Sequence, residues 1–219
     1  MSILHTISNI DRLKNEMSSL HGKRKTSEPQ LWVYGCSITV ASGIPDHCKY
    51  YNLVNEVFGF QNITVVAENS SSIPWSADQI LRSDLLKGDI VIWGLTSRYR
   101  FPYFLINKLI HVRSDVIAEN KHLQKVINLD AVACNDNLYR SYTNILQVIN
   151  FCKKLGVKLY ICGMLSDKDF DQLLLDHTEY ISAGVFNGVE DFIDFAPDKM
   201  HPGIQQHKKY AELILKNQK

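Results

Sequence analysis

Short runs of apolar residues alternate with amphipathic stretches through most of the chain. The apolar runs occupy residues 31–34, 62–67, 89–93 and 157–162, and three of them are followed directly by a glycine. Near-continuous apolar runs are typical of strands that are buried on both faces of a parallel sheet. We therefore expect four strands at these positions.

The residues between these runs show helical periodicity. Amphipathic stretches cover 47–58, 76–86, 137–155 and 203–216, and Gly156 follows the third stretch as an expected helix C-cap. Strands that alternate with helices imply βαβ crossovers. The pattern predicts an α/β fold, a three-layer sandwich with a mainly parallel sheet.

The first twenty residues carry a separate amphipathic pattern. Apolar side chains recur three or four positions apart, at Ile3, Ile7, Ile10, Leu13, Met17 and Leu20. A polar connector follows and ends at Pro29, and we expect its basic cluster at 23–25 to be solvated. We predict an N-terminal helix and connector over 1–30 and an α/β domain over 31–219. The apolar stripe packs either on this domain or on a partner, and a second copy as partner would make a homo-oligomer.

Composition narrows the function classes. The 219 residues are 45% hydrophobic and 21% charged, which is ordinary for a globular domain. With 24 Lys and Arg against 23 Asp and Glu, the net charge is +1, so we expect neither nucleic acid nor an anionic membrane as a partner. No apolar run approaches the ~20 residues of a membrane span, and the N-terminus is a poor secretory signal.

The cysteines indicate a reducing compartment. They are odd in number, scattered and without a C-x-x-C pair: Cys36, Cys48, Cys134, Cys152 and Cys162. This spacing argues against a disulfide framework and against a zinc site. His47 and His177 also lack metal-ligand spacing. We predict a cytoplasmic protein with reduced thiols, no metal and no cofactor.

Candidate chemistry is expected at one edge of the sheet, because ligands of such folds bind beyond the carboxyl ends of the strands. The loops at that edge are 35–45, 68–74, 94–102 and 195–203. The first holds Ser37, between a strand and a helix whose free N–H groups could stabilise an oxyanion. A serine in this place could equally cap a turn.

The last loop places Asp198 three residues before His201, at the entrance to the C-terminal helix. A serine nucleophile needs a base to accept its proton, and that base needs a partner that fixes its tautomer. Pro202 favours an extended conformation for His201, which could direct the ring toward the first loop. The two loops together therefore predict nucleophilic catalysis.

The Gly-Cys-Ser of 35–37 and the Asp-Lys-Met-His-Pro of 198–202 resemble the SGNH (GDSL-type) hydrolase superfamily. The order of elements agrees across most of the chain. The resemblance implies a flavodoxin-like α/β fold and a Ser-His-Asp triad. Carried over by position, Ser37 would be the nucleophile, His201 the general base and acid, and Asp198 the residue that orients His201.

Two other blocks of the family pattern are altered. The family usually takes oxyanion donors from the serine N–H, from a glycine after the second strand, and from the asparagine of a Gly-x-Asn-Asp motif after the third. Here the loop after the second strand has no glycine, although a serine of 70–72 could replace that donor. Aligning Gly94 with the family glycine puts Thr96 in place of the asparagine and Ser97 in place of the aspartate. The resemblance then implies Ser37, Thr96 and Ser97 as oxyanion donors.

Two arginines in the same loop provide local positive charge. Either Arg98 or Arg100 binds a carboxylate or phosphate of the substrate, or both pair with acidic residues at the surface. Nearby aromatic residues offer either a stacking surface for a sugar or ordinary packing: Trp75, Tyr99, Phe101 and Tyr103.

These observations predict a serine esterase that hydrolyses an acyl ester, such as that of an O-acetylated saccharide, through Ser37, His201 and Asp198. Two alternatives stay open. The same triad could transfer the acyl group to a saccharide hydroxyl. The altered oxyanion positions are also consistent with a degenerate module that binds a ligand without turnover.

Overall fold

The computed structural model describes residues 23–24, 26–105, 108–112, 117, 121, 124, 135–165, 168–186 and 188–218. The predicted N-terminal helix lies outside these residues, and its role in assembly stays a prediction. Among the helices that are described, none is long and apolar enough to cross a membrane.

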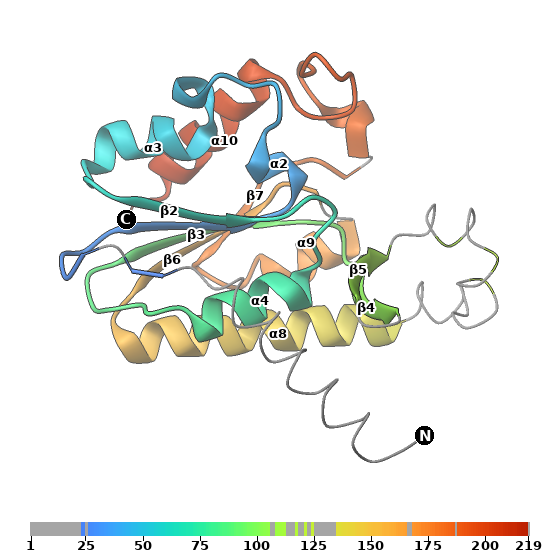
Figure 1. The fold of residues 1–219 in the computed structure, drawn as a ribbon, viewed down its shortest axis with the longest axis horizontal. Helices are drawn as coiled ribbons and strands as arrows, with labels where there is room; N and C mark the ends of the chain where they lie inside the picture. The colour runs from blue at the N-terminus through green and yellow to red at the C-terminus, as the bar shows by residue number, and fades with distance from the viewer. Residues whose placement is uncertain are drawn as a thin grey trace.

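Five parallel strands form the central sheet in the order β2-β1-β3-β6-β7 (Figure 1). They are β1 (Leu31–Gly35), β2 (Ile63–Ala67), β3 (Ile90–Leu95), β6 (Lys158–Gly163) and β7 (Tyr180–Ser182). In the register, Leu31 lies opposite Ile63 on one side and opposite Ile90 on the other. This order confirms the predicted mainly parallel, flavodoxin-like sheet.

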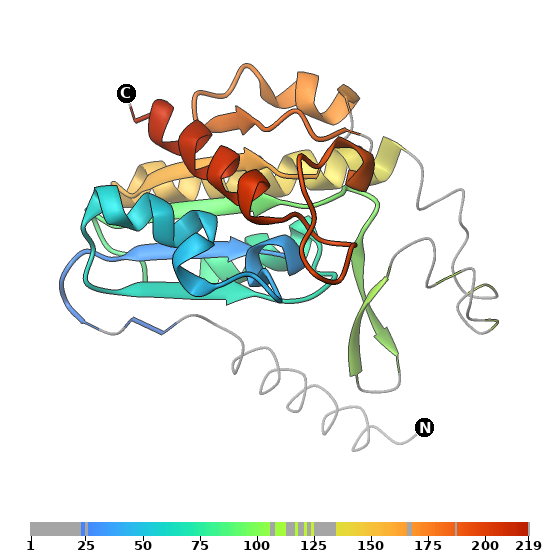
Figure 2. The same cartoon turned by 90° about the horizontal axis from the view of Figure 1, so that it is seen from above.

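Helices cover both faces of the sheet, so the fold has three layers (Figures 1 and 2). One face carries α3 (Tyr50–Phe58) and α10 (Ile204–Lys216); the other carries α4 (Ile73–Arg82), α8 (Asn135–Leu155) and α9 (Lys168–Leu174). Side chains alternate along β1, so that Trp32 and Tyr34 pack toward α4 and α8, whereas Leu31 and Val33 pack toward α3 and α10. All four are fully buried, as the continuous apolar run predicts.

The structure shifts several predicted boundaries. Helix α4 begins at Ile73 because the Ser72 hydroxyl caps it, accepting a hydrogen bond from Trp75 N at 3.3 Å. Gly156 ends α8 with φ +70°, which confirms the predicted C-cap. The loop expected over 94–102 is shorter, since β3 continues to Leu95. An antiparallel hairpin of β4 (Phe101–Leu105) and β5 (Lys108–Val112) then follows, which the sequence pattern did not predict.

One residue of the basic cluster, Arg24, is bound to the domain, which corrects the prediction at that position; Lys23 is exposed, as expected, and Lys25 lies outside the described residues. Arg24 forms an ion pair with Asp89, whose side chain is fully buried. Asp89 also accepts hydrogen bonds from Gln30 N at 3.0 Å, Trp32 Nε1 at 3.1 Å and Leu86 N at 2.8 Å. These donors offset the free-energy cost of burying the Asp89 carboxylate. Residues of the predicted connector therefore help to fix the starts of β1 and β3.

Candidate active site

Ser37 lies directly beyond the carboxyl end of β1. Cys36 is the N-cap of the short helix α2 (Ser37–Val40), and its carbonyl accepts hydrogen bonds from Thr39 N at 2.9 Å and Val40 N at 3.0 Å. The N–H of Ser37, at the first position of the turn, donates to no backbone carbonyl of the described residues. The half-buried Ser37 thus offers a hydroxyl and an N–H at the same edge of the sheet.

Two glycines allow α2 to approach the sheet closely. A Cβ on Gly35 would lie 2.0 Å from Thr39 Oγ1, and one on Gly94 would lie 3.1 Å from the same atom. Thr39 is fully buried, and its hydroxyl lies 3.1 Å from the hydroxyl of Tyr50. Because Gly35 and Gly94 have no side chains, Thr39 can pack against the ends of β1 and β3. This contact holds α2, and with it Ser37, close to the sheet.

The structure brings Asp198 and His201 together. His201 Nδ1 lies 2.6 Å from Asp198 Oδ2, and the other carboxylate oxygen accepts hydrogen bonds from Met200 N and His201 N, both at 3.0 Å. The chain folds back here: Ala196 N donates to His201 O at 2.8 Å, and Lys199 at the bend has φ +57°. Asp198 thereby fixes both the ring and the backbone of His201.

These hydrogen bonds also determine the charge of Asp198. The bond with His201, followed by those from the N–H groups of Met200 and His201, lowers the pKa of Asp198 from 3.8 to about 2. Asp198 is therefore a carboxylate throughout the neutral range. With its Nδ1 held by this carboxylate, His201 presents Nε2 as the nitrogen that can accept a proton.

The loop that carries this pair packs against the chain segment that follows Ser37. Ala196 is buried together with Ala41 and Ile44, and Pro197 Cδ lies 3.3 Å from the place of a Cβ on Gly43. Figure 2 shows the loop before α10 beside α2. Among the described residues no hydrogen bond joins Ser37 to His201, so the structure places the two loops together without closing that contact.

The predicted oxyanion donors occupy different surroundings. Thr96 follows β3 and is 2% exposed, and its buried hydroxyl has no hydrogen-bond partner in the described part of the chain. Ser97 is half-buried, and its Oγ accepts a hydrogen bond from Tyr99 N at 3.3 Å. Ser71 is engaged elsewhere, because its hydroxyl donates to Gly35 O at 2.9 Å. Of these three hydroxyl groups, that of Thr96 has no hydrogen-bond partner in the described part of the chain.

The arginines and aromatic residues of these loops are also placed. Arg98 Nη2 donates to the Tyr99 hydroxyl at 2.9 Å, and its guanidinium carbon lies 4.9 Å from the centre of that ring. Arg100 is half-buried, and its Nη1 atom is buried without a hydrogen-bond partner among the residues described. Trp75 is 6% exposed within the core, which rules it out as a stacking surface. The side chains of Phe101 and Tyr103 lie outside the described residues.

Asp194 holds the loop in place and was not predicted from the sequence. Its carboxylate accepts hydrogen bonds from Gln205 N and Gln206 N, both at 2.9 Å, in the first turn of α10. A Cβ on Gly203 would lie 2.4 Å from Asp194 Oδ2, so the glycine leaves room for this contact. An aspartate that caps a helix from ten residues upstream has no local sequence signal.

Residues that could hold a metal do not gather in the structure as described: no three His, Cys, Asp or Glu side chains cluster suitably. Cys36, beside Ser37, is a free thiol that is 1% exposed. The polar groups at this edge of the sheet are therefore a hydroxyl, an Asp-His pair and a small set of hydrogen-bond donors.

Comparison with known proteins shows likeness in structure only. No protein-family model matches the sequence, and no curated protein sequence matches it. The crystal structure of TesA is similar over 87% of this chain and 98% of that chain, with a TM-score of 0.51 and 12% identity.

Two further structures resemble the chain at lower scores. A member of the lipolytic protein G-D-S-L family from Veillonella parvula gives a TM-score of 0.49 at 12% identity, over 86% of this chain and 97% of that one. A catalytic mutant of Axe2, an acetylxylan esterase from Geobacillus stearothermophilus, gives 0.47 at 16% identity, over 88% and 94%. At 12% identity, the likeness to TesA shows a shared fold.

Proposed function

We propose that this protein is a serine hydrolase of the SGNH type that cleaves carboxylic esters, with Ser37 as nucleophile. The observation that carries the proposal is the 2.6 Å contact between His201 Nδ1 and Asp198 Oδ2, on a loop packed beside the segment that follows Ser37. A histidine oriented by a carboxylate is the base that a serine hydroxyl needs.

In the proposed reaction, Ser37 Oγ attacks the acyl carbonyl while His201 Nε2 accepts the hydroxyl proton. The ester C–O bond then breaks, and His201 returns that proton to the departing alcohol. A water molecule attacks the acyl-enzyme, again losing its proton to His201, and the carboxylic acid is released as Ser37 regains its hydrogen. Asp198 stays ionised and stabilises the imidazolium in each step.

The negative charge that develops on the carbonyl oxygen needs donors, and three groups are proposed. The N–H of Ser37 is free of backbone acceptors in the described chain, and the Thr96 hydroxyl has no partner there, so neither gives up an internal hydrogen bond. Ser97 is the third. Removing one such donor typically lowers the rate about 10²- to 10³-fold.

The proposed substrate is an acyl ester, with an O-acetylated saccharide as one candidate. Arg100 is proposed to bind an anionic group on the substrate, because its Nη1 atom has no hydrogen-bond partner among the described residues. Arg98 is proposed for the same role, although its Nη2 already contacts Tyr99. The chemistry requires no metal or cofactor, and acyl transfer to a sugar hydroxyl would use the same groups.

A second candidate is binding of a ligand without turnover. It is favoured by one observation, that no hydrogen bond joins Ser37 to His201 in the described chain. Such contacts are often longer in free enzymes and tighten only when substrate binds, so activity measurements have to distinguish the two.

The decisive experiment measures hydrolysis of p-nitrophenyl acetate and butyrate and covalent labelling by a fluorophosphonate. We expect the wild-type protein to turn over the esters and to carry the label on Ser37. Ser37→Ala should abolish both, whereas Ser27→Ala, at an exposed serine of the connector, should change neither. A wild-type protein that shows neither turnover nor label contradicts the hydrolase and favours the binding module.

A further inference from the structure

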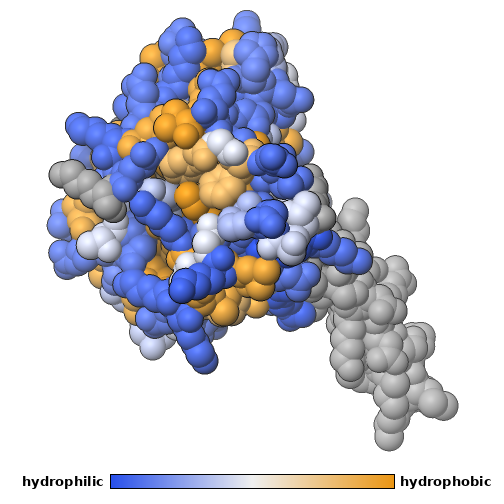
Figure 3. Space-filling view, turned by 90° about the vertical axis from the view of Figure 1, so that its left-hand side faces the viewer, coloured by the Kyte–Doolittle hydropathy of each residue, from blue (hydrophilic) through white to orange (hydrophobic). Residues whose placement is uncertain are grey.

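A pocket lies at the opposite end of the strands from Ser37 and His201. It has a volume of about 230 Å³ and lies beside the start of β6, between the end of α8 and Asn217, which follows α10. Figure 3 shows this end of the molecule, where apolar surface lines a hollow surrounded by hydrophilic residues. The hydrolase mechanism uses none of the residues that line this pocket.

The pocket exists because β7 is shorter than β6. The ladder between them begins at Ile161 and Tyr180, where Ile161 N donates to Glu179 O at 2.7 Å. A turn closed by the hydrogen bond from Tyr180 N to His177 O then takes the preceding chain away from β6. The first half of β6 is therefore left without a neighbour on this side.

An unpaired stretch of backbone faces the pocket. Lys158 N donates to Asp89 O at 3.0 Å, toward β3, whereas Ile161 N donates toward β7. Peptide groups alternate in direction along a strand, so the N–H and C=O of Leu159 point to the open side. Leu159 lies before the first pair of the β6–β7 ladder, so it presents one donor and one acceptor to a ligand.

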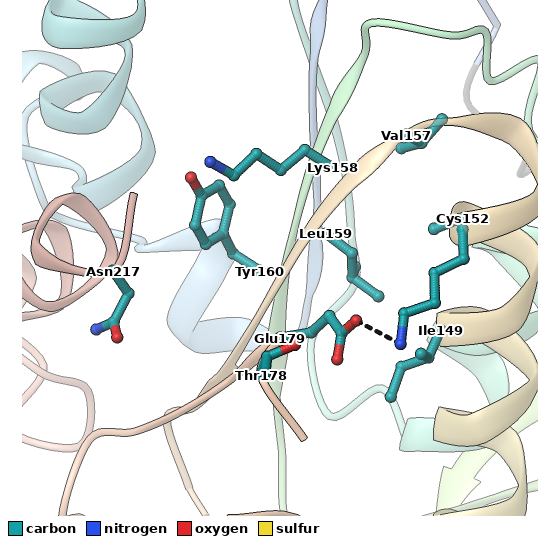
Figure 4. A pocket seen from close by; sticks show the side chains of 10 residues that line it. Ile149, Cys152, Val157, Lys158, Leu159, Tyr160, Thr178, Glu179 and Asn217 are labelled. Atoms are coloured by element: carbon teal, nitrogen blue, oxygen red, sulfur yellow. Dashed lines mark ion pairs between the residues drawn. The ribbon is translucent and has the colours of Figure 1, made fainter. Parts of the chain in front are cut away.

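Charged groups stand on both sides of this backbone (Figure 4). Lys153 Nζ lies 2.8 Å from Glu179 Oε1, while Glu179 Oε2 is buried and has no hydrogen-bond partner among the described residues. Burial is the largest single influence and would raise the pKa of Glu179, but the hydrogen bonds to its carboxylate, that of Lys153 first, and the charge of Lys153 together outweigh burial and hold the pKa below its usual value. Glu179 is thus a carboxylate with one oxygen left to accept.

Lys158 and Tyr160 form the other side. Lys158 Nζ donates to Gln218 O at 3.0 Å and lies 5.2 Å from the centre of the Tyr160 ring. An ammonium group has three donors, so Lys153 and Lys158 both have donors to spare. Tyr160 is 3% exposed, and its buried hydroxyl has no partner within the described chain. A ligand can supply the missing contact.

The remaining wall is apolar. Ile149, Cys152, Val157 and Leu159 line it, and each is at most 6% exposed. At roughly 30 Å³ per water-sized atom, the pocket holds about eight non-hydrogen atoms. The site therefore combines an anionic oxygen, two cations with free donors, a strand edge and room for a short aliphatic group.

We propose that this pocket binds a free α-amino acid with an aliphatic side chain, of the size of valine or leucine. Its ammonium group donates to Glu179 Oε2 and to the carbonyl of Leu159. Its carboxylate accepts from the N–H of Leu159, from Lys158 and from the Tyr160 hydroxyl. Its side chain packs on Ile149 and Val157. The proposal is independent of ester hydrolysis.

Calorimetric titration of the full chain with L-leucine and its analogues tests the proposal. N-acetyl-L-leucine lacks the ammonium group, isoamylamine lacks the carboxylate, and L-serine lacks the aliphatic group. We expect L-leucine to bind and each analogue to bind at least tenfold more weakly. Absence of binding by millimolar L-leucine, or equal binding of the analogues, overturns the proposal.

Variants locate the binding. Glu179→Gln and Tyr160→Phe should each weaken L-leucine binding at least tenfold, while Glu56→Gln and Tyr139→Phe, which change exposed residues, should leave it unchanged. Tyr160→Phe removes an unpaired buried hydroxyl, so its melting temperature should not fall, which separates loss of binding from loss of fold. If L-leucine binds both pocket variants as tightly as wild type, it binds elsewhere and the assignment is wrong.

Discussion

Asp198 holds His201 through two contacts at once, a carboxylate oxygen 2.6 Å from the ring nitrogen Nδ1 and the other 3.0 Å from the backbone N–H. One side chain therefore sets the tautomer of the imidazole and the shape of the loop. The two functions can be separated, since an amide keeps the shape of the carboxylate and loses its charge.

We predict that Asp198→Asn lowers kcat/KM for p-nitrophenyl acetate by about 10³- to 10⁴-fold, because His201 loses the partner that selects its tautomer and stabilises the imidazolium. Asp176→Asn, at an exposed position, is the matched control and should leave the rate unchanged. A loss of less than tenfold in Asp198→Asn means that Asp198 does not orient the catalytic base.

His201 and Asp198 could be found from the sequence because they are three residues apart and precede a predicted helix. The central strands were equally accessible, since residues such as Trp32 and Ile92 lie in runs buried on both faces. The hairpin was not, because Pro102 lies within β4 and proline argues against a strand. With three residues, β7 is too short to give a pattern.

The contacts that escaped prediction, within the site and outside it, join residues that are distant in the sequence. Ser71 bonds to Gly35 across thirty-six positions, and Arg24 reaches Asp89 across sixty-five. No periodicity or spacing records such pairs. The pocket beside β6 could not be predicted for the same reason, because it forms where the pairing between β6 and β7 ends.

We predict that a side chain at Gly35 lowers the free energy of unfolding because it would collide with Thr39. In Gly35→Ala the new Cβ would lie 2.0 Å from Thr39 Oγ1, so α2 has to move, at a cost of about 1–3 kcal/mol in the free energy of unfolding. Any displacement of α2 also displaces Ser37. The double variant Gly35→Ala, Thr39→Ala should recover part of the stability, measured by urea unfolding. If the two changes are simply additive, Thr39 is not the obstacle.

The connector contact gives a prediction on stability and assembly. Arg24→Ala leaves Asp89 buried without its cation and should cost about 3 kcal/mol or more, whereas Lys23→Ala, at an exposed position, should stay within about 0.5 kcal/mol. A chain that lacks residues 1–22 retains Arg24, whereas a chain that lacks residues 1–30 does not. Only the longer deletion should therefore lower the free energy of unfolding as Arg24→Ala does. Light scattering on the shorter deletion tests the predicted homo-oligomer: if wild type is oligomeric and the number of chains per particle is unchanged, residues 1–22 are excluded as the interface.

His207 predicts how stability depends on pH. Its ring is fully buried and its Nδ1 accepts a hydrogen bond from Tyr50 N at 3.3 Å; burial lowers its pKa from 6.5 to about 4. Between these values the unfolded chain binds a proton that the folded chain does not, so the free energy of unfolding falls as pH drops from 6.5 to about 4. At about 1.4 kcal/mol per pKa unit, the loss is roughly 3 kcal/mol.

Urea unfolding at intervals from pH 8 to pH 4 measures this dependence. His207→Asn keeps an acceptor for Tyr50 N and cannot titrate, so it should be less stable than wild type at pH 7 and should lose less stability toward pH 4. His47→Asn, at an exposed position, should follow the wild-type curve. If the wild-type curve runs parallel to that of His207→Asn over this interval, His207 accepts a proton equally well in the folded and the unfolded chain. Its burial against α3 then does not hold the ring neutral.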